Sequence, residues 1–220
     1  MRSLHVSPRR FAFQMFLLKI CGYRGVSVNE LYTHLNSSKS GKVVGISFDD
    51  GYKNNLTNAL PILKKFGFTA TIYLVSQNIG GSNHWDIDKG IKKQMMLSEN
   101  DINKWIDSGM EIGSHTQNHQ DLTSCSNKTA INEIIQSKID LEHRFKTPIN
   151  HFCYPYGNFN NTIIDLIKKA GYLTATTTKR GRIKHNHNLF SLPRVQITHH
   201  TLPHLFLLKI LTNYEDRRTR

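Results

Sequence analysis

The sequence predicts an α/β protein in which helices cover a parallel β-sheet within a single domain. Short β-branched or apolar runs alternate with amphipathic helical segments, a pattern typical of parallel sheets built from strand–helix units. Glycines follow several of the helical segments and so mark their ends. At 220 residues with 38% hydrophobic side chains, the chain has the size and apolar content of one large domain, and α/β barrels often reach this length undivided.

Helices are predicted where apolar residues recur at spacings of three and four and where a capping residue or a glycine marks an end. Ser98, with Asp101 three residues later, resembles a capping box at the start of one of them. In chain order the predicted helices span 8–21, 27–35, 54–66, 98–108, 128–145, 159–170 and 202–212. The glycines that end them are Gly22, Gly67, Gly109 and Gly171.

Strands are predicted at the β-branched and apolar runs between these helices. In chain order they span 43–48, 69–75, 111–114, 151–154, 173–178 and 192–197. A turn at 39–41 precedes the first strand, and residues 77–93, rich in Gly, Asn and Lys, are predicted to form a long loop. Strands and helices in this order favour a sheet whose strands all run in the same direction.

Polar residues follow these strands at the points where they end. The groups concerned are Asp49-Asp50-Gly51, His115 with His119, Tyr154-Pro155-Tyr156-Gly157, and Arg194 in the last strand. In a (β/α) barrel the catalytic groups gather at the C-terminal ends of the strands. The shared placement of these groups therefore predicts one site at one end of a barrel.

One aspartate of the Asp49-Asp50 pair, together with His115 and His119, makes a three-ligand set that leaves metal positions open for water and substrate. The other aspartate is then available as a general base. Adjacent side chains on an extended backbone point in opposite directions, so both carboxylates reach one site only where the strand ends, and Gly51 allows that turn. Asp-Gly turns and isolated His-x-x-x-His pairs are common by themselves, so the metal-hydrolase hypothesis depends on their combination.

These motifs resemble those of a known family, the polysaccharide deacetylases that share the NodB homology domain (family 4 carbohydrate esterases). Phe48-Asp49-Asp50-Gly51 resembles the first family motif, His115-Thr116-Gln117-Asn118-His119 the second, and Cys153-Tyr154-Pro155-Tyr156-Gly157 the third. The resemblance spans at least residues 43–197. It implies a distorted (β/α) barrel, a divalent metal that is usually zinc, and removal of N- or O-acetyl groups from amino sugars. We expect a single domain over 1–220, with an N-terminal helical segment at 1–38, a catalytic core at 43–197, and a basic C-terminal helix and tail at 198–220.

The resemblance also implies roles for individual residues. Asp49 would be the general base, and Asp50, His115 and His119 would bind the metal. Thr116 would brace the histidine loop, and the backbone N–H of Tyr156 would help to bind the oxyanion.

Two departures from the family pattern stand out. Many members have an arginine in the third motif that orients the base, whereas this chain has Cys153 and resembles the Tyr-Pro-Tyr-Gly subgroup. Arg194 is expected to orient the base instead, with an ordinary structural ion pair as the alternative. The histidine that protonates the leaving amine is also missing, because His5 lies too close to the first helix, and His199 and His200 lack the expected context. Either a neighbouring residue replaces it or the chain is shortened at its N-terminus.

Two further functions are open alternatives to a metal-dependent deacetylase. One is a non-catalytic homologue that binds metal and glycan but lacks the acid. The other is a basic nucleic-acid-binding module, which no motif calls for. Trp85 in the long loop is a candidate for contact with a saccharide, Trp105 is expected in the core, and Cys153 is expected to be a buried small residue rather than a nucleophile.

The net charge of +13 is concentrated at the two ends of the chain. Residues 1–24 carry five basic and no acidic side chains, and residues 179–220 carry nine basic and two acidic ones. Such ends predict either a solvated surface or attraction to an anionic membrane or glycan. Residues 11–21 superficially resemble a signal peptide, but Gln14 and Lys19 interrupt the apolar run, so an ordinary helix and a cytoplasmic location are expected. The three unpaired cysteines weakly favour a reducing compartment.

Overall fold

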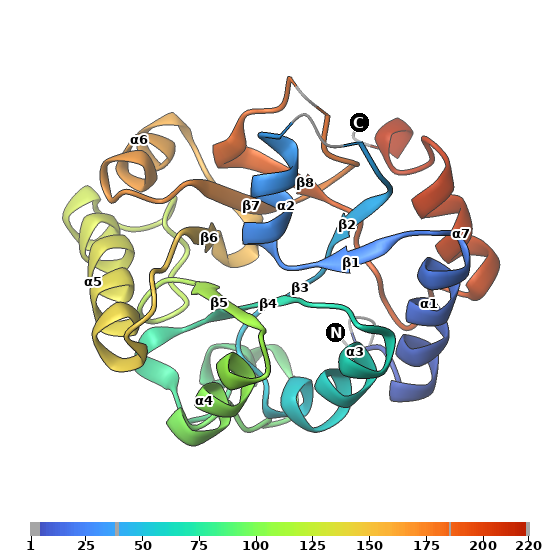
Figure 1. The fold of residues 1–220 in the computed structure, drawn as a ribbon. Coiled ribbons are helices and arrows are strands. Elements are labelled where there is room, and N and C mark those ends of the chain that lie inside the picture. Colours follow the sequence, from blue (N-terminus) through green and yellow to red (C-terminus); the bar gives the residue numbers. More distant parts are fainter. Residues whose placement is uncertain (1–4, 38–39, 185, 219–220) are drawn as a thin grey trace.

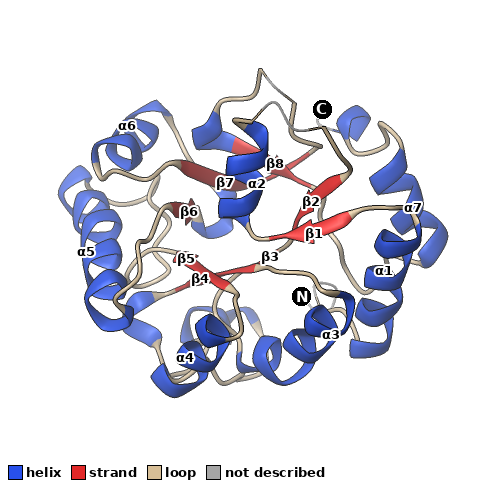
Figure 2. Cartoon of the chain, in the orientation of Figure 1, coloured by secondary structure: helices blue, strands red, loops and turns tan. Residues whose placement is uncertain are grey.

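A curled sheet of six parallel strands forms the centre of the molecule and is surrounded by helices (Figures 1 and 2). The computed structural model describes residues 5–37, 40–184 and 186–218. The strands follow one another in sequence order across the sheet: β3 (Ser47–Phe48), β4 (Thr71–Leu74), β5 (Glu111–Ser114), β6 (His151–Cys153), β7 (Thr174–Arg180) and β8 (Leu192–Arg194). The sheet does not close by pairing, because β3 and β8 are its two edges. The distorted (β/α) barrel expected from the motifs is confirmed.

All but one of the helices contribute apolar side chains to one core with this sheet. The exception is α2 (Val28–Leu35), which crosses the middle of the view and whose buried Val28 belongs to a separate cluster with Tyr73 and Cys153 (Figure 2). The other helices are α1 (Pro8–Ile20), α3 (Leu60–Phe66), α4 (Glu99–Asp107), α5 (Asn127–Phe145), α6 (Asn161–Lys169) and α7 (Pro203–Leu211). Met15 of α1 and Phe206 of α7 belong to the same buried cluster as Ile72 of β4. The finer division of the chain at residues 38, 43 and 197 stays a prediction.

The predicted strand 43–48 is divided between two sheets, which corrects the expectation of one continuous strand. Its first part, β2 (Val43–Gly45), pairs with a short strand β1 (Arg24–Val26) that was not predicted. Ile46 makes the transition, because its N–H donates to the Val26 carbonyl while its own carbonyl accepts from Thr71. A Cβ on Gly25 would meet the Phe68 ring at 2.7 Å, so β1 approaches the core too closely for a larger residue. A three-residue strand with a central glycine carries almost no periodic signal.

The predicted helix 54–66 is also irregular. Residues Asn55–Ala59 form a π-helical turn before α3 begins, and the Leu60 N–H donates to the Asn55 carbonyl. Pro61 has no N–H to continue the ordinary ladder, and a π-turn is one way in which a helix accommodates such a break.

The remaining differences are at element ends. The last strand stops at Arg194 rather than at 197, and the predicted loop 77–93 contains short 3₁₀ turns at Ser76–Asn78 and His84–Lys89. The capping box of Ser98 and Asp101 is confirmed, with both reciprocal hydrogen bonds present. Among the described residues, no helix combines the length and apolar character that crossing a membrane requires.

Candidate active site

Asp50, His115 and His119 converge at the C-terminal ends of β3 and β5. The Oδ1 atom of Asp50 lies 3.3 Å from Nε2 of His115 and 3.3 Å from Nε2 of His119. One ligand atom from each of the three residues lies within 4.8 Å of the others, which is a spacing that one metal ion can bridge. Both imidazoles are buried, whereas the Asp50 side chain retains partial exposure, so the group opens to solvent on one side.

The chemistry of His115 fits a cation in this position. Its Nδ1 lies 2.7 Å from the Cys153 carbonyl, which can only accept, so Nδ1 carries the proton. In the neutral ring, Nε2 then carries no proton, and its lone pair faces the Asp50 carboxylate. Burial lowers the pKa of His115, but Cys153 and Asp50 outweigh burial and raise the pKa well above its usual value. The pocket therefore favours a positive charge between the three side chains, and a divalent metal supplies one.

The backbone is strained where the site residues lie. The non-glycine residues with positive φ, among those described, are Asp50 (71°), Thr116 (65°), His119 (59°), Lys146 (51°) and Tyr156 (58°). All but Lys146 belong to the motifs at the strand ends. Positive φ costs non-glycine residues free energy and tends to persist where the surrounding structure fixes a functional geometry. The turn after β3 is also tight, since a Cβ on Gly51 would lie 2.8 Å from the Leu74 side chain.

Asp49 lies beside the candidate metal-ligand cluster of Asp50, His115 and His119, and it is bound by Arg194. Two parallel hydrogen bonds of 2.7 Å join Nη1 and Nη2 of Arg194 to the two carboxylate oxygens of Asp49. Burial alone would raise the pKa of Asp49, but the Arg194 guanidinium more than offsets burial and holds the pKa below its usual value. Asp49 is therefore an ionised carboxylate in a fixed orientation, which is the state a general base requires.

Arg194 is itself positioned by groups from three other strands. Its Nε donates to the Thr177 carbonyl at 2.9 Å, and Nη1 lies 3.3 Å from the Ser47 hydroxyl. Its Nη2 lies 3.4 Å from Sγ of the fully buried Cys153. Arg194 thus joins β3 to β8, the two edges of the open sheet, by a side chain rather than by strand pairing.

The loop that carries the histidines is braced by Glu133 of α5, which the sequence reasoning missed. The Glu133 carboxylate accepts hydrogen bonds from the backbone N–H of Gln117 (3.0 Å) and Asn118 (2.8 Å) and from the Asn118 side chain (2.7 Å). The Thr116 carbonyl accepts a hydrogen bond from the Ser76 N–H, and the bracing role expected of Thr116 stays a prediction. The Thr116 hydroxyl is buried without a hydrogen-bond partner. The signal in the sequence was the position of Glu133, which lies three residues after Ala130 and directly before Ile134, on the apolar side of the predicted helix 128–145.

Aromatic rings enclose His119. The Trp85 indole stacks on the imidazole, with centroids 4.5 Å apart and planes within 13°, and the Tyr156 ring meets it edge-on at 4.8 Å. His119 Nδ1 is buried without a hydrogen-bond partner among the described residues, so ring packing and the contact of Nε2 with Asp50 together orient this imidazole. Trp85, expected to contact saccharide, thus packs against a site residue. Trp105 is fully buried in the core, as expected.

The histidines considered as proton donors lie in different places. His5 is exposed, and its ring centroid is 6.4 Å from that of Tyr52, two residues after Asp50. His199 and His200 pack against each other, with centroids 3.7 Å apart, and the His199 carbonyl accepts a hydrogen bond from Arg10. Of these three, His5 is the one whose ring contacts a near neighbour of Asp50 in the sequence, Tyr52.

The chain is similar in sequence to known polysaccharide deacetylases. A model of the polysaccharide deacetylase family matches residues 36–175. The protein YxkH of Bacillus subtilis is 30% identical over 198 residues, covering 89% of this chain and 67% of that protein. The poly-beta-1,6-N-acetyl-D-glucosamine N-deacetylase of Staphylococcus aureus is 27% identical over 214 residues, covering 93% of this chain and 71% of that enzyme.

Solved structures are similar over nearly the whole chain. A deacetylase from Streptococcus pyogenes in complex with acetate matches with a TM-score of 0.82 and 27% identity, covering 94% of this chain and 88% of that one. A polysaccharide deacetylase from Bacillus cereus matches with a TM-score of 0.81 and 32% identity, covering 96% of this chain and 63% of that one.

Proposed function

The chain belongs to the polysaccharide deacetylase family, and from that premise we propose that it hydrolyses the acetamide groups of an N-acetylated polysaccharide with Asp49 as general base and a divalent metal on Asp50, His115 and His119. Membership in this family makes the protein an enzyme of the carbohydrate esterase type. The geometry of the four residues is what supports the particular assignment of roles.

The metal ligands are proposed from the donor set. One carboxylate and two imidazoles suit zinc and related divalent ions, and the fixed Nδ1 proton on His115 directs its Nε2 toward the ion. When bound, the ion supplies Lewis acidity toward the amide carbonyl and lowers the pKa of a coordinated water. Zinc is the proposed metal. The protein would supply three ligands, Asp50, His115 and His119, so a bound ion would keep open positions for water and substrate.

The base and its partner arginine perform the proton transfer. Asp49 accepts the proton of the attacking water as the water oxygen forms its bond to the amide carbon. Arg194 holds both Asp49 oxygens, so the carboxylate is ionised and oriented before the substrate arrives. The backbone N–H of Tyr156 is proposed to donate to the oxyanion. The C–N bond then breaks as the nitrogen takes up the proton that Asp49 had accepted, which gives acetate and a free amine on the sugar.

The substrate class is proposed from the relatives. The Staphylococcus aureus relative is named for poly-β-1,6-linked N-acetylglucosamine, and the Streptococcus pyogenes structure holds acetate. An N-acetylated amino-sugar polymer is therefore the first substrate to test.

The single observation that carries this proposal is the bidentate contact of Arg194 with Asp49 beside the Asp50–histidine cluster. The test measures acetate release from poly-N-acetylglucosamine and chito-oligosaccharides, together with metal content. Asp49→Asn should lower kcat by about 100- to 10,000-fold while metal binding is retained. Asp165→Asn, an exposed carboxylate on α6, serves as the control and should leave kcat unchanged. Normal activity in Asp49→Asn would refute the assignment, and bound metal without acetate release from the wild type would favour the non-catalytic alternative.

A further inference from the structure

Helix α1 exposes a stripe of large apolar side chains. Phe13, Phe16 and Ile20 are 45%, 43% and 61% exposed. Their spacing of three and four residues places them on one side of the helix, while Met15 and Leu18 on the other side are buried in the core. This face of α1 has no covering element among the described residues.

Helix α7 adds a second stripe beside it. Leu208 and Leu211 are 40% and 47% exposed, and α7 packs against α1 on the same side of the molecule (Figure 1). Helix α3 contacts α1 as well, and its Lys64 and Lys65 are exposed. We call the exposed residues of these helices the α1–α3–α7 surface: Arg9, Phe13, Phe16, Lys19, Ile20, Lys64, Lys65, Leu208 and Leu211.

This surface is free of acidic residues. Neither α1, nor the π-turn Asn55–Ala59, nor α3, nor α7 contains Asp or Glu. The two acids that follow α7 are already engaged, since Glu215 is fully buried between Arg180 and Lys209, and Asp216 accepts from Arg182. Apolar and basic side chains are thus exposed together.

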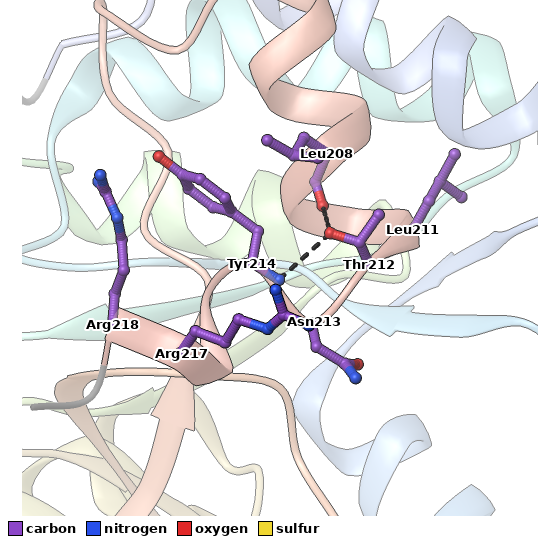
Figure 3. Close-up of a pocket in the computed structure, with 7 residues that line it drawn as sticks. All are labelled: Leu208, Leu211, Thr212, Asn213, Tyr214, Arg217 and Arg218. Atoms are coloured by element: carbon purple, nitrogen blue, oxygen red, sulfur yellow. Dashed lines mark hydrogen bonds between the residues drawn. The ribbon is translucent and has the colours of Figure 1, made fainter.

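A cavity of about 740 Å³ lies at the C-terminal end of α7 (Figure 3). Leu208 and Leu211 line it on the helix side, and Arg217 and Arg218 line it from the following turn. The Arg218 guanidinium lies 4.7 Å from the centre of the Tyr214 ring. Apolar and guanidinium side chains thus line the same hollow, and such a lining suits a group that carries both a phosphate and hydrocarbon.

We propose that the α1–α3–α7 surface docks on an anionic lipid bilayer. The exposed apolar side chains would enter the boundary between head groups and acyl chains, and the basic residues around them would be attracted to lipid phosphates. A second copy of the chain fits less well, because two such basic surfaces would repel each other.

A matched control exists elsewhere on the molecule. Helix α5 exposes a comparable stripe of Ile131, Ile135 and Ile139, at 40%, 41% and 50%. That helix also carries the acidic residues Asp140 and Glu142, so its apolar stripe is not surrounded by basic residues alone. An anionic bilayer should therefore bind the stripe on α1 and not the stripe on α5.

The test measures flotation of the full chain with vesicles of phosphatidylcholine alone and of phosphatidylcholine mixed with phosphatidylglycerol. The wild type should bind the anionic vesicles and lose binding as salt increases. Phe13→Ser/Phe16→Ser/Ile20→Ser should abolish flotation, and Ile131→Ser/Ile135→Ser/Ile139→Ser should retain it. Circular dichroism checks that each variant folds. Lys64→Gln/Lys65→Gln, which alters no apolar contact, should weaken binding by about fivefold for each lysine removed.

The proposal is overturned if the wild type fails to float with anionic vesicles or floats equally with neutral ones. It is also overturned if the α5 variant loses binding as completely as the α1 variant. Dimerisation that the α1 variant abolishes, without any vesicle binding, would assign the surface to a second copy instead. If the α1 variant does not fold, the lysine variant decides the matter, since unchanged binding there contradicts the role of charge. None of these outcomes depends on deacetylase activity.

Discussion

Replacing Arg194 by methionine tests the link between the arginine and the proposed base most directly. The substitution removes both 2.7 Å hydrogen bonds to Asp49 and leaves the carboxylate without its cation. Breaking a buried ion pair in this way costs about 3–5 kcal/mol of folding free energy. The Arg194 and Asp49 side chains are 21% and 32% exposed, so water screens part of that loss, and we expect about 2 kcal/mol.

The kinetic consequence is a slower reaction whose pH dependence moves. An aspartate that is no longer oriented should lower kcat by about 10- to 100-fold. Because Arg194 holds the pKa of Asp49 low, its removal raises that pKa, and Asp49 becomes protonated at higher pH. The acid limb of the pH–rate profile should therefore shift to higher pH. Arg194→Lys keeps the charge but not the two parallel bonds, so its acid limb should stay nearer that of the wild type while kcat falls.

Arg180→Met is the control for stability alone. Arg180 binds the buried Glu215 through two bonds of 2.7 and 2.9 Å, an arrangement of the same type outside the metal-ligand cluster. Acetate release from a small acetylated substrate, followed from acid to neutral pH, gives the profile, and urea denaturation gives the stability. Arg180→Met should keep the acid limb of the wild type. If Arg194→Met keeps it as well, Arg194 does not control the pKa of Asp49, and the prediction is wrong.

Three further changes test the surroundings of the metal site and the core. Trp85→Ala should weaken divalent-metal affinity about tenfold, because stacking helps to orient His119, whereas Trp85→Phe should retain most of that affinity; equal affinities in a metal titration would contradict this. Glu133→Ala removes three acceptor contacts from the histidine loop and should lower the free energy of unfolding by about 2 kcal/mol, measured with urea; a change within error would show that the loop holds itself. Burial, with a smaller effect of Lys138, lowers the pKa of His151 to about 4. Histidine in the unfolded chain titrates near pH 6.5, so the unfolded chain takes up a proton before folded His151 does, and the free energy of unfolding falls by up to about 3 kcal/mol as the pH drops from 6.5 toward 4. His151→Asn should flatten the dependence of the free energy of unfolding on pH over that interval, and an unchanged slope would contradict this prediction.

The residue types at the proposed site could be identified from the sequence because they lie in short, contiguous motifs. Asp49, Asp50, His115 and His119 follow runs whose strand character is a local property, and parallel strands bring their C-terminal ends together. The capping box at Ser98 was equally local. Such features depend on neighbours within a few residues, and the sequence displays those neighbours directly.

Only the tertiary structure decided how these residues are held. The contact of Arg194 with Asp49 joins residues 145 positions apart, and Glu133 reaches the histidine loop from a different helix. The stacking of Trp85 on His119 likewise gives this residue a packing role that the sequence did not indicate, while its expected contact with saccharide stays a prediction. These contacts depend on the curvature of the sheet and on the packing of helices around it, which are cooperative properties of the whole chain. Local propensity therefore determined which groups are present, and the global fold determined their orientation, charge state and support.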